Sequence, residues 1–174
     1  AVGWLDADAA GIFLNKGFEL ELETVYELPR DSLHTRVRIG EGVAGTVAQT
    51  HQSIHLVNYT RDWRGKSDLP YANDFGSMIS VPLIYGGVVI GVLMVITGKH
   101  GRLFAQEDVH LLELLGAQAA VAIAHSRSLH QVESGRNQLE SLLVSTESPV
   151  IAVNRHFELI FVNPAARELF SIDD

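Results

Sequence analysis

An uncharged stretch, residues 77–98, contains no Asp, Glu, Lys or Arg and limits the folds open to this chain. Its length would suffice for a transmembrane helix. Pro82 and the adjacent Gly86 and Gly87 interrupt it, however, and each of these residues weakens a helix interior. The runs on either side are rich in β-branched residues, and two such runs around a Gly-Gly pair are typical of a β-hairpin. We therefore predict a buried hairpin here and no membrane insertion.

Composition narrows the class of protein further. The chain has 174 residues, of which 47% are hydrophobic and 20% charged, so it is expected to fold as a globular protein with a sizeable core. A net charge of -8 argues against nucleic acid or an anionic membrane as the main partner. The chain has no cysteine, which removes disulfides, thiolate metal ligands and cysteine nucleophiles. We expect a cytoplasmic protein without a secretory signal.

The first half of the chain has the two-residue period of β-strands. Leu20, Leu22 and Tyr26 alternate with glutamates, which indicates a strand with one face in water. The strands predicted in this half are residues 9–14, 18–28, 36–39 and 53–57. A glycine-rich run, residues 40–45, leads into a short helix that ends near Thr50. Residues 58–76 form the longest irregular segment.

After Phe104 the period becomes helical. Residues 105–147 contain no proline and begin with acidic residues, so we predict one long helix, with a candidate interruption near Ser134 and Gly135. Up to about Ala124 it is expected to pack on its own sheet. A three-four repeat from Leu111 predicts a coiled-coil seam, and beyond about Ala124 this seam is expected to need a partner, which predicts a homodimer through this helix. The predicted seam comprises Leu115, Ala122, His125, Leu129, Val132, Leu139 and Leu143.

The tail has the period of strands again, at residues 150–153 and 157–162. Asn163 and Pro164 then have the residue types of a helix cap and a first helical position. Two strands and one short helix cannot form a core by themselves. We therefore predict that the chain ends inside a second domain.

The order of these elements resembles the GAF domain family of small-molecule sensor modules. The resemblance covers roughly residues 5–130 and lacks most of the family's first helix. The matching stretches are residues 40–45, 54–62, 78–83, 90–93 and 104–108, with the helix through Ala124. It implies an α+β, profilin-like fold: a central antiparallel sheet of about five or six strands with flanking helices, plus the long C-terminal helix. It also implies a ligand pocket under residues 58–76.

Residues 149–166 resemble the opening of a PAS domain. We accordingly expect a GAF-like sensor at residues 1–130, a signalling helix at 131–147 and the start of a PAS domain at 148–174. Together these parts resemble the sensory half of a bacterial two-component sensor histidine kinase. The alternatives are a ligand-free dimerisation module and the sensor of a cyclic-dinucleotide enzyme.

Residues 58–76 hold aromatic side chains interleaved with polar ones, a composition that suits a small planar ligand. The alternative is that these aromatics only cap the core beneath a long loop. The predicted ligand-binding residues are His55, Asn58, Tyr59, Arg61, Asp62, Trp63, Tyr71, Phe75, Ser77 and Ser80.

Several kinds of chemistry are disfavoured. Gly40, Gly42 and Gly45 have the spacing of a dinucleotide fingerprint, but no βαβ unit surrounds them, so turn formation and close packing are the preferred interpretation. The predicted strand begins between His51 and His55, so the two do not share a helical face, and within a strand their side chains would lie about 13 Å apart, too far to share a metal ion. No metal site is predicted. His55 alone could be an axial ligand of haem. No catalytic motif is present, so no enzyme activity is expected in this fragment.

The identity of the ligand stays open. Family members that bind cyclic nucleotides carry Asn-Lys, Phe and Asp-Glu; here Asn58 precedes Tyr59, and no Asp-Glu pair occurs. These departures argue against a cyclic nucleotide, and the missing cysteine excludes a covalent bilin. The remaining possibilities are a non-covalent small molecule, a haem and no ligand.

Overall fold

The computed structural model describes residues 5–171, and at 129–140 and 143 it describes the backbone alone. Contacts divide the chain into two compact units, Ala1–Ala124 and His125–Asp174. The sensor-like features predicted from the sequence all lie in the first unit.

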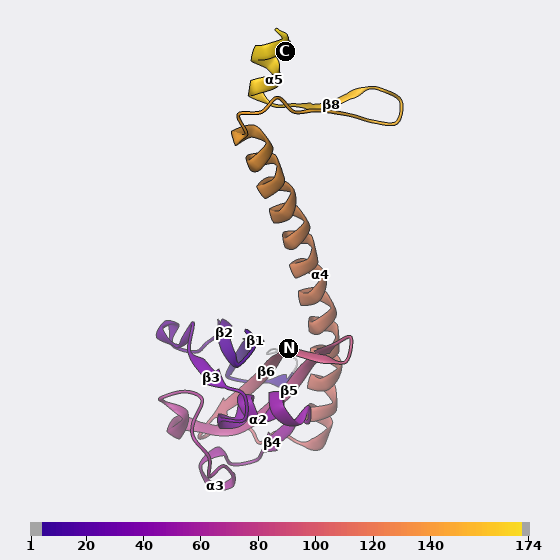
Figure 1. Cartoon of the computed structure of the whole chain (residues 1–174). Coiled ribbons are helices and arrows are strands. Elements are labelled where there is room, and N and C mark those ends of the chain that lie inside the picture. The colour runs from indigo at the N-terminus through magenta and orange to yellow at the C-terminus, as the bar shows by residue number, and fades with distance from the viewer. Residues whose placement is uncertain (1–4, 172–174) are drawn as a thin grey trace. The chain divides into compact units, whose positions relative to one another are not determined.

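A six-stranded antiparallel sheet forms the centre of the first unit (Figure 1), as the predicted fold class requires. The strand order is β3-β2-β1-β6-β5-β4. The strands are β1 (Ala9–Asn15), β2 (Glu19–Tyr26), β3 (Arg36–Arg38), β4 (Ile54–Leu56), β5 (Phe75–Tyr85) and β6 (Val88–Gly98). A short 3-10 helix, η1 (Arg30–Ser32), precedes β3.

The uncharged stretch forms the hairpin β5–β6, which confirms the prediction. Tyr85 pairs with Val88, and the two glycines between them, Gly86 and Gly87, have positive φ angles of 59° and 81°. A tight two-residue turn of this kind needs positive φ at both positions, which glycine adopts without strain. Because β5 and β6 are central strands whose middle residues are buried on both faces, their sequence carries no charged residue.

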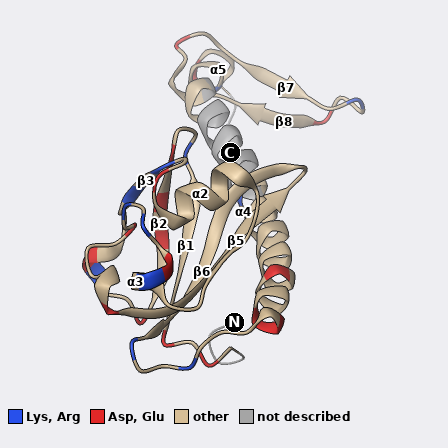
Figure 2. Ribbon diagram, turned by 90° about the horizontal axis from the view of Figure 1, so that it is seen from below, with Lys and Arg blue, Asp and Glu red and all other residues tan. Residues whose placement is uncertain are grey.

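Each face of the sheet has its own apolar core, and successive residues of β5 contribute to opposite faces. Met78 belongs to the core beneath α2 (Gly42–Thr50), and Ile79 belongs to the core beneath α4 (Gln106–Ser145). Figure 2 shows these two helices on different sides of the sheet. We call the side with α2 and residues 58–76 the roof face, and the side with α4 the helix face.

Helix α4 runs without a break through Ser134 and Gly135, so the predicted interruption is wrong. Its first turns pack closely on β5: a Cβ at Gly116 would lie 3.0 Å from Val81 Cγ2. Residues Gln106–Ser128 are also long and apolar enough to cross a membrane, with a mean hydropathy of 1.2. Core helices of water-soluble proteins meet the same criterion, and Leu112 and Ala120 are buried against the sheet.

The predicted seam residues lie in different surroundings along α4. Leu115 is half-buried, whereas Ala122 and His125 are exposed. The most exposed large apolar side chains of this part of α4 are Leu114 (69%) and Val121 (42%), which the predicted seam omits. The side chains of Leu129, Val132, Leu139 and Leu143 lie outside the described residues.

The second unit contains the end of α4, a two-stranded sheet and a short helix. The predicted tail elements are present as β7 (Ile151–Val153), β8 (Leu159–Val162) and α5 (Pro164–Phe170). Asn163 caps α5 as expected: its Oδ1 accepts hydrogen bonds from Ala166 N at 2.9 Å and from Val150 N at 2.8 Å. The same amide therefore joins the helix start to the first strand.

Candidate functional site

The candidate site is built on residues 58–76, the roof segment, which connects β4 to β5. It contains two short helices, α3 (Tyr59–Asp62) and η2 (Ala72–Asp74). Tyr59, Leu69 and Phe75 from this segment share one apolar core with Val43 and Val47 of α2. The roof segment is therefore ordered by side chains that reach under it rather than by regular strands.

The four predicted aromatic residues of the roof segment differ in burial. Tyr59 and Phe75 are buried, with their rings edge-to-face at 5.5 Å, and Tyr71 meets Phe75 at 6.2 Å in the same way. Trp63 and Tyr71 are partly buried against the same core. Burial raises the pKa of both tyrosines. These rings cap the core, and Tyr71 and Phe75 also line a cavity.

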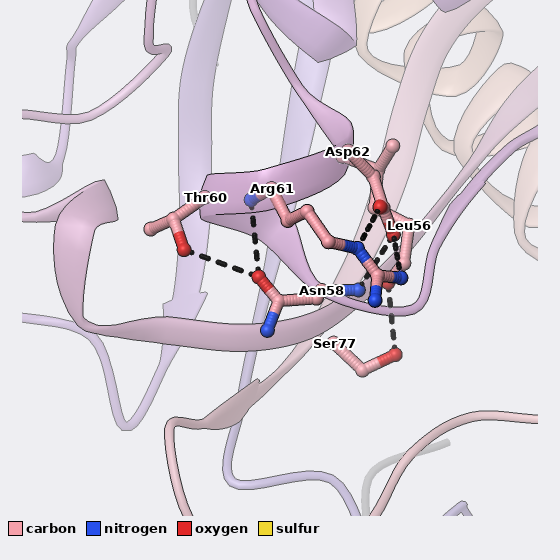
Figure 3. A network of polar contacts seen from close by, with 6 residues as sticks. All are labelled: Leu56, Asn58, Thr60, Arg61, Asp62 and Ser77. Carbon is pink, nitrogen blue, oxygen red and sulfur yellow. Dashed lines mark hydrogen bonds and ion pairs between the residues drawn. The ribbon is translucent and has the colours of Figure 1, made fainter.

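Asn58, Arg61 and Asp62 bond mainly to one another (Figure 3). Asn58 Oδ1 caps α3 by accepting from Arg61 N at 3.0 Å, and Asp62 Oδ2 accepts from Asn58 N at 2.8 Å. Arg61 Nε donates to Asp62 Oδ1 at 2.7 Å, and this hydrogen bond lowers the pKa of Asp62. All three residues are exposed, and their bonds stabilise the turn at the start of the roof segment.

Asp68 joins the roof segment to α2, and we call this contact the Asp68 latch. Its Oδ2 accepts hydrogen bonds from Val43 N and Ala44 N, both at 3.1 Å. Helix N-termini need such an acceptor, and Glu41, at the cap position, makes no side-chain capping bond. Asp68 is 8% exposed, and burial raises its pKa to about 6. Within the part of the chain that the structure describes, Oδ1 has no hydrogen-bond partner.

The glycine run explains why the latch fits. Gly42 has a φ of +63°, and a Cβ there would lie 1.7 Å from Asp68 Oδ1. A Cβ at Gly45 would lie 2.2 Å from the carbonyl oxygen of Arg38. The predicted roles of the glycines in turn formation and close packing are confirmed. The backbone amides of Val43 and Ala44, at the start of α2, donate to Asp68.

A cavity of about 280 Å³ lies at the end of the roof segment. Tyr71, Asp74 and Phe75 line it from the roof segment, with Asp8 and Leu28 opposite. Asp74 pairs with Lys99 at 3.1 Å, and Asp8 accepts from Gly98 N at 2.7 Å. Aromatic walls with a few polar groups have the composition of a small-molecule site.

The three remaining predicted site residues lie in the strands. Ser77 Oγ donates to Leu56 O at 2.9 Å and accepts from Phe104 N at 3.3 Å, so it joins β4, β5 and the entry to α4. Ser80 is buried, and among the described residues its Oγ has no hydrogen-bond partner. His55 lies beside the helix face, with its Nε2 3.0 Å from Phe104 O. The predicted residues therefore do not surround a single cavity.

One group of potential metal ligands lies at the β2–β3 edge, where Figure 2 shows acidic residues beside basic ones. Ligand atoms of Glu21, Glu23 and His34 lie within 4.8 Å of one another. His34 Nδ1 lies 2.8 Å from Glu21 Oε1, and Arg36 pairs with Glu21 Oε2 at 3.2 Å. The hydrogen bond from His34 lowers the pKa of Glu21. We interpret the group as a network of ion pairs.

Two features of the site were not predicted from the sequence. The first is the role of Asp68, for which one signal exists: a helix that begins in a glycine run needs an acceptor from elsewhere. The second is a cavity on the helix face, where Ser53 Oγ donates to Glu113 Oε1 at 2.7 Å. No local pattern predicts a contact between residues so far apart in the sequence.

Comparison with known proteins places this geometry in a family. The chain is 24% identical to a probable 3',5'-cyclic phosphodiesterase of Caenorhabditis elegans, an alignment that covers 97% of this chain and 25% of the relative. The chain thus spans about a quarter of that protein's length. Among solved structures, the GAF domain of a phosphoenolpyruvate-protein phosphotransferase from Coxiella burnetii is similar, with a TM-score of 0.65 and 24% identity over 75% of this chain and 79% of that one.

The second GAF domain of DevS from Mycobacterium smegmatis has the same fold, with a TM-score of 0.62 and 19% identity over 75% of this chain and 90% of that one. The GAF domain family model matches residues 1–124, which include the whole six-stranded sheet, α2, the roof segment and the first turns of α4. The chain therefore belongs to the GAF domain family, whose members are small-molecule-sensing and regulatory modules.

Proposed function

We propose that this chain is the small-molecule-sensing and dimerising module of a multidomain signalling protein of the sensor histidine kinase type. Family membership over residues 1–124 supports a sensing role. The observation that carries the proposal is the cavity of about 280 Å³ at the end of the roof segment, where Tyr71 and Phe75 offer aromatic walls. The ligand would be a non-covalent small molecule that touches the roof segment from within.

The Asp68 latch supplies a switch. A ligand changes a conformational equilibrium only if it binds the two states differently. With the latch closed, Asp68 holds the roof segment on α2, although burial disfavours its ionised form. A ligand under the roof segment that fits only the closed or only the open latch would shift this balance.

Helix α4 is the proposed output. It begins on the helix face and continues into the second unit, whose hairpin and short helix we propose to be the start of a PAS domain. The exposed Leu114 and Val121 support a homodimer through α4, because large apolar side chains on a helix favour a partner helix. Two such helices would carry a change in the sensor to the following domain.

A ligand-free dimerisation module is the second candidate, and one observation favours it. Tyr59 and Leu69 fill the centre of the space under the roof segment. In this case the roof segment would serve only to cover the core. Cyclic nucleotides are the weaker ligand candidates, because the sequence departs from the members that bind them.

Native mass spectrometry of the purified chain separates these candidates. Sensing predicts a population heavier than the polypeptide by one small molecule, released under denaturing conditions. The Phe75→Ala variant should reduce that population, whereas Phe157→Ala, in the second unit, should not. A polypeptide of bare mass that also fails to bind any member of a metabolite library would contradict sensing and favour the ligand-free module.

Dimerisation has a separate test. Leu129→Lys and Leu143→Lys should convert a dimer to a monomer in multi-angle light scattering, because they place a charge in the predicted seam. Glu107→Lys, at an exposed position in the first turn of α4, is the control and should leave the mass unchanged. Unchanged masses for both leucine variants would contradict the seam.

A further inference from the structure

A second cavity, of about 570 Å³, lies on the helix face. Val109, Glu113 and Ala117 line it from α4, His55 from β4, and Ile84 from β5. The lining includes no residue of the roof segment. This volume is within the range of small-molecule sites, and nothing derived above uses it.

The cavity exists because β4 is short. Ile54, His55 and Leu56 pair with β5 only as far as Ser80, so in the described chain the later part of β5 has no strand neighbour on this side. Pro82 lies in this open stretch and has no N–H to offer a further strand. The sheet edge therefore borders a groove along α4.

Hydrogen bonds hold two polar side chains of this cavity, Glu113 and His55, so that each still offers an acceptor; His51, Gln52 and Gln106 also line it. Ser53 Oγ donates to Glu113 Oε1 at 2.7 Å, which positions the carboxylate and leaves Oε2 as an acceptor. His55 Nε2 lies 3.0 Å from Phe104 O. Because a carbonyl can only accept, Nε2 carries the hydrogen, and in the neutral ring Nδ1 is an acceptor. Among the described residues no cation pairs with Glu113.

The other walls are apolar. Val109 is buried at the base, and Ile84, which is 39% exposed, lies at the rim with Ala117. Glu113 and Ala117 are one turn apart on α4, so an acceptor and an apolar surface are neighbours on the same face. A ligand with a cationic donor at one end and a short apolar chain at the other matches both.

We propose that this cavity binds an organic cation, with its ammonium group on Glu113 and its apolar part against Ile84 and Ala117. The ligand would touch α4 directly at Val109, Glu113 and Ala117. It would be a second input to the same helix, on the opposite side of the sheet from the roof segment. The proposal does not depend on a ligand under the roof segment.

Calorimetric titration of the full chain with n-hexylamine tests the proposed chemistry, with 1-hexanol and hexanoate as probes of the same tail. We expect saturable binding of the amine, and at least about tenfold weaker binding of the other two, because only the amine can form a charge-assisted bond with Glu113. No saturable binding of the amine, or equal binding of all three compounds, would overturn the proposal.

Variants locate the binding. Glu113→Gln keeps the acceptor for Ser53 but removes the charge, and should weaken amine binding about tenfold. Glu107→Gln, another exposed acid of α4 outside the cavity, should leave binding within about twofold, since the two charges are on different sides of the first turns. Equal effects of the two substitutions would contradict the proposal.

Ala117→Phe should abolish amine binding by filling the rim. Ala117 is exposed, so the fold should tolerate the larger side chain, and a melting curve checks this. Light scattering of the same variant is the remaining control: a changed mass would mean that a second copy of the chain occupies the groove, which would overturn the ligand assignment.

Discussion

The two faces of the sheet are covered in different ways. On the roof face an irregular segment is joined to α2 by one buried carboxylate, Asp68, and by the side chains that reach beneath it. On the helix face a continuous helix places Val109, Leu112 and Ala120 in the core. Irregular segments that few backbone hydrogen bonds join to the rest of a domain open locally at lower cost than core helices, which open with the whole domain. In the proposed function the roof segment is therefore the part that responds, and α4 is the part that transmits.

The largest effect is expected on the helix face. Leu112→Ala should lower the free energy of unfolding by about 4 kcal/mol, because it leaves a cavity beneath α4. Urea denaturation measures the loss, and hydrogen exchange should accelerate throughout the first unit. Acceleration confined to residues 106–124 would contradict the view that α4 opens only with the whole domain.

On the roof face, Gly42→Ala should lower the free energy of unfolding by about 3 kcal/mol, because of strain at positive φ and the steric clash with Asp68. Its matched control is Gly86→Ala, which has a similar φ of +59° and no atom within 4 Å of the added Cβ. The control should lose only about 1 kcal/mol. Similar losses of stability in the two variants would mean that the clash with Asp68 adds nothing to the cost of positive φ.

The latch also predicts a dependence on pH. Burial raises the pKa of Asp68 to about 6, so protonation of this carboxyl stabilises the folded state relative to the unfolded state. This contribution to stability is complete below pH 4 and is lost as the pH rises above 6. The stability of the wild type relative to Asp68→Asn should therefore fall by about 2 kcal/mol between pH 4 and pH 7. Denaturation at a series of pH values measures it. A difference that is constant, or that rises with pH, would contradict the assignment.

The smallest effect is expected at the start of the roof segment. Asn58→Ala removes the cap of α3 and should cost about 1 kcal/mol, with faster exchange only in residues 58–63. Asn73→Ala, exposed in the same segment, is the control and should change stability little. An equal loss from both would show that the cap does not organise the turn.

Periodicity accounts for what could be predicted from the sequence. The uncharged stretch, the Gly-Gly turn and the alternation of β2 each depend on neighbours in the chain, and all appear in the structure. The end of α2 before His51 and the cap at Asn163 are local in the same sense. The predicted break at Gly135 is wrong because one glycine costs only about 1 kcal/mol in a helix.

The candidate site was less predictable because its contacts are long-range. Composition identified the roof segment, yet it did not show that Asp68 bonds to α2 or that His55 lies beside the other face. The partner of Glu113 is likewise set by how β4 and α4 meet, which no local pattern records. Sequence order predicts the elements, and packing decides which side chains share a cavity.

Asp68 is expected to hold a roof segment that can open independently of α4. Hydrogen–deuterium exchange of the wild type and Asp68→Ala at neutral pH tests it most directly. We predict that residues 58–76 exchange at least about tenfold faster in the variant while residues 106–124 keep their protection, because local opening does not expose the helix face. Unchanged exchange in the roof segment, or equal acceleration in α4, would contradict the account.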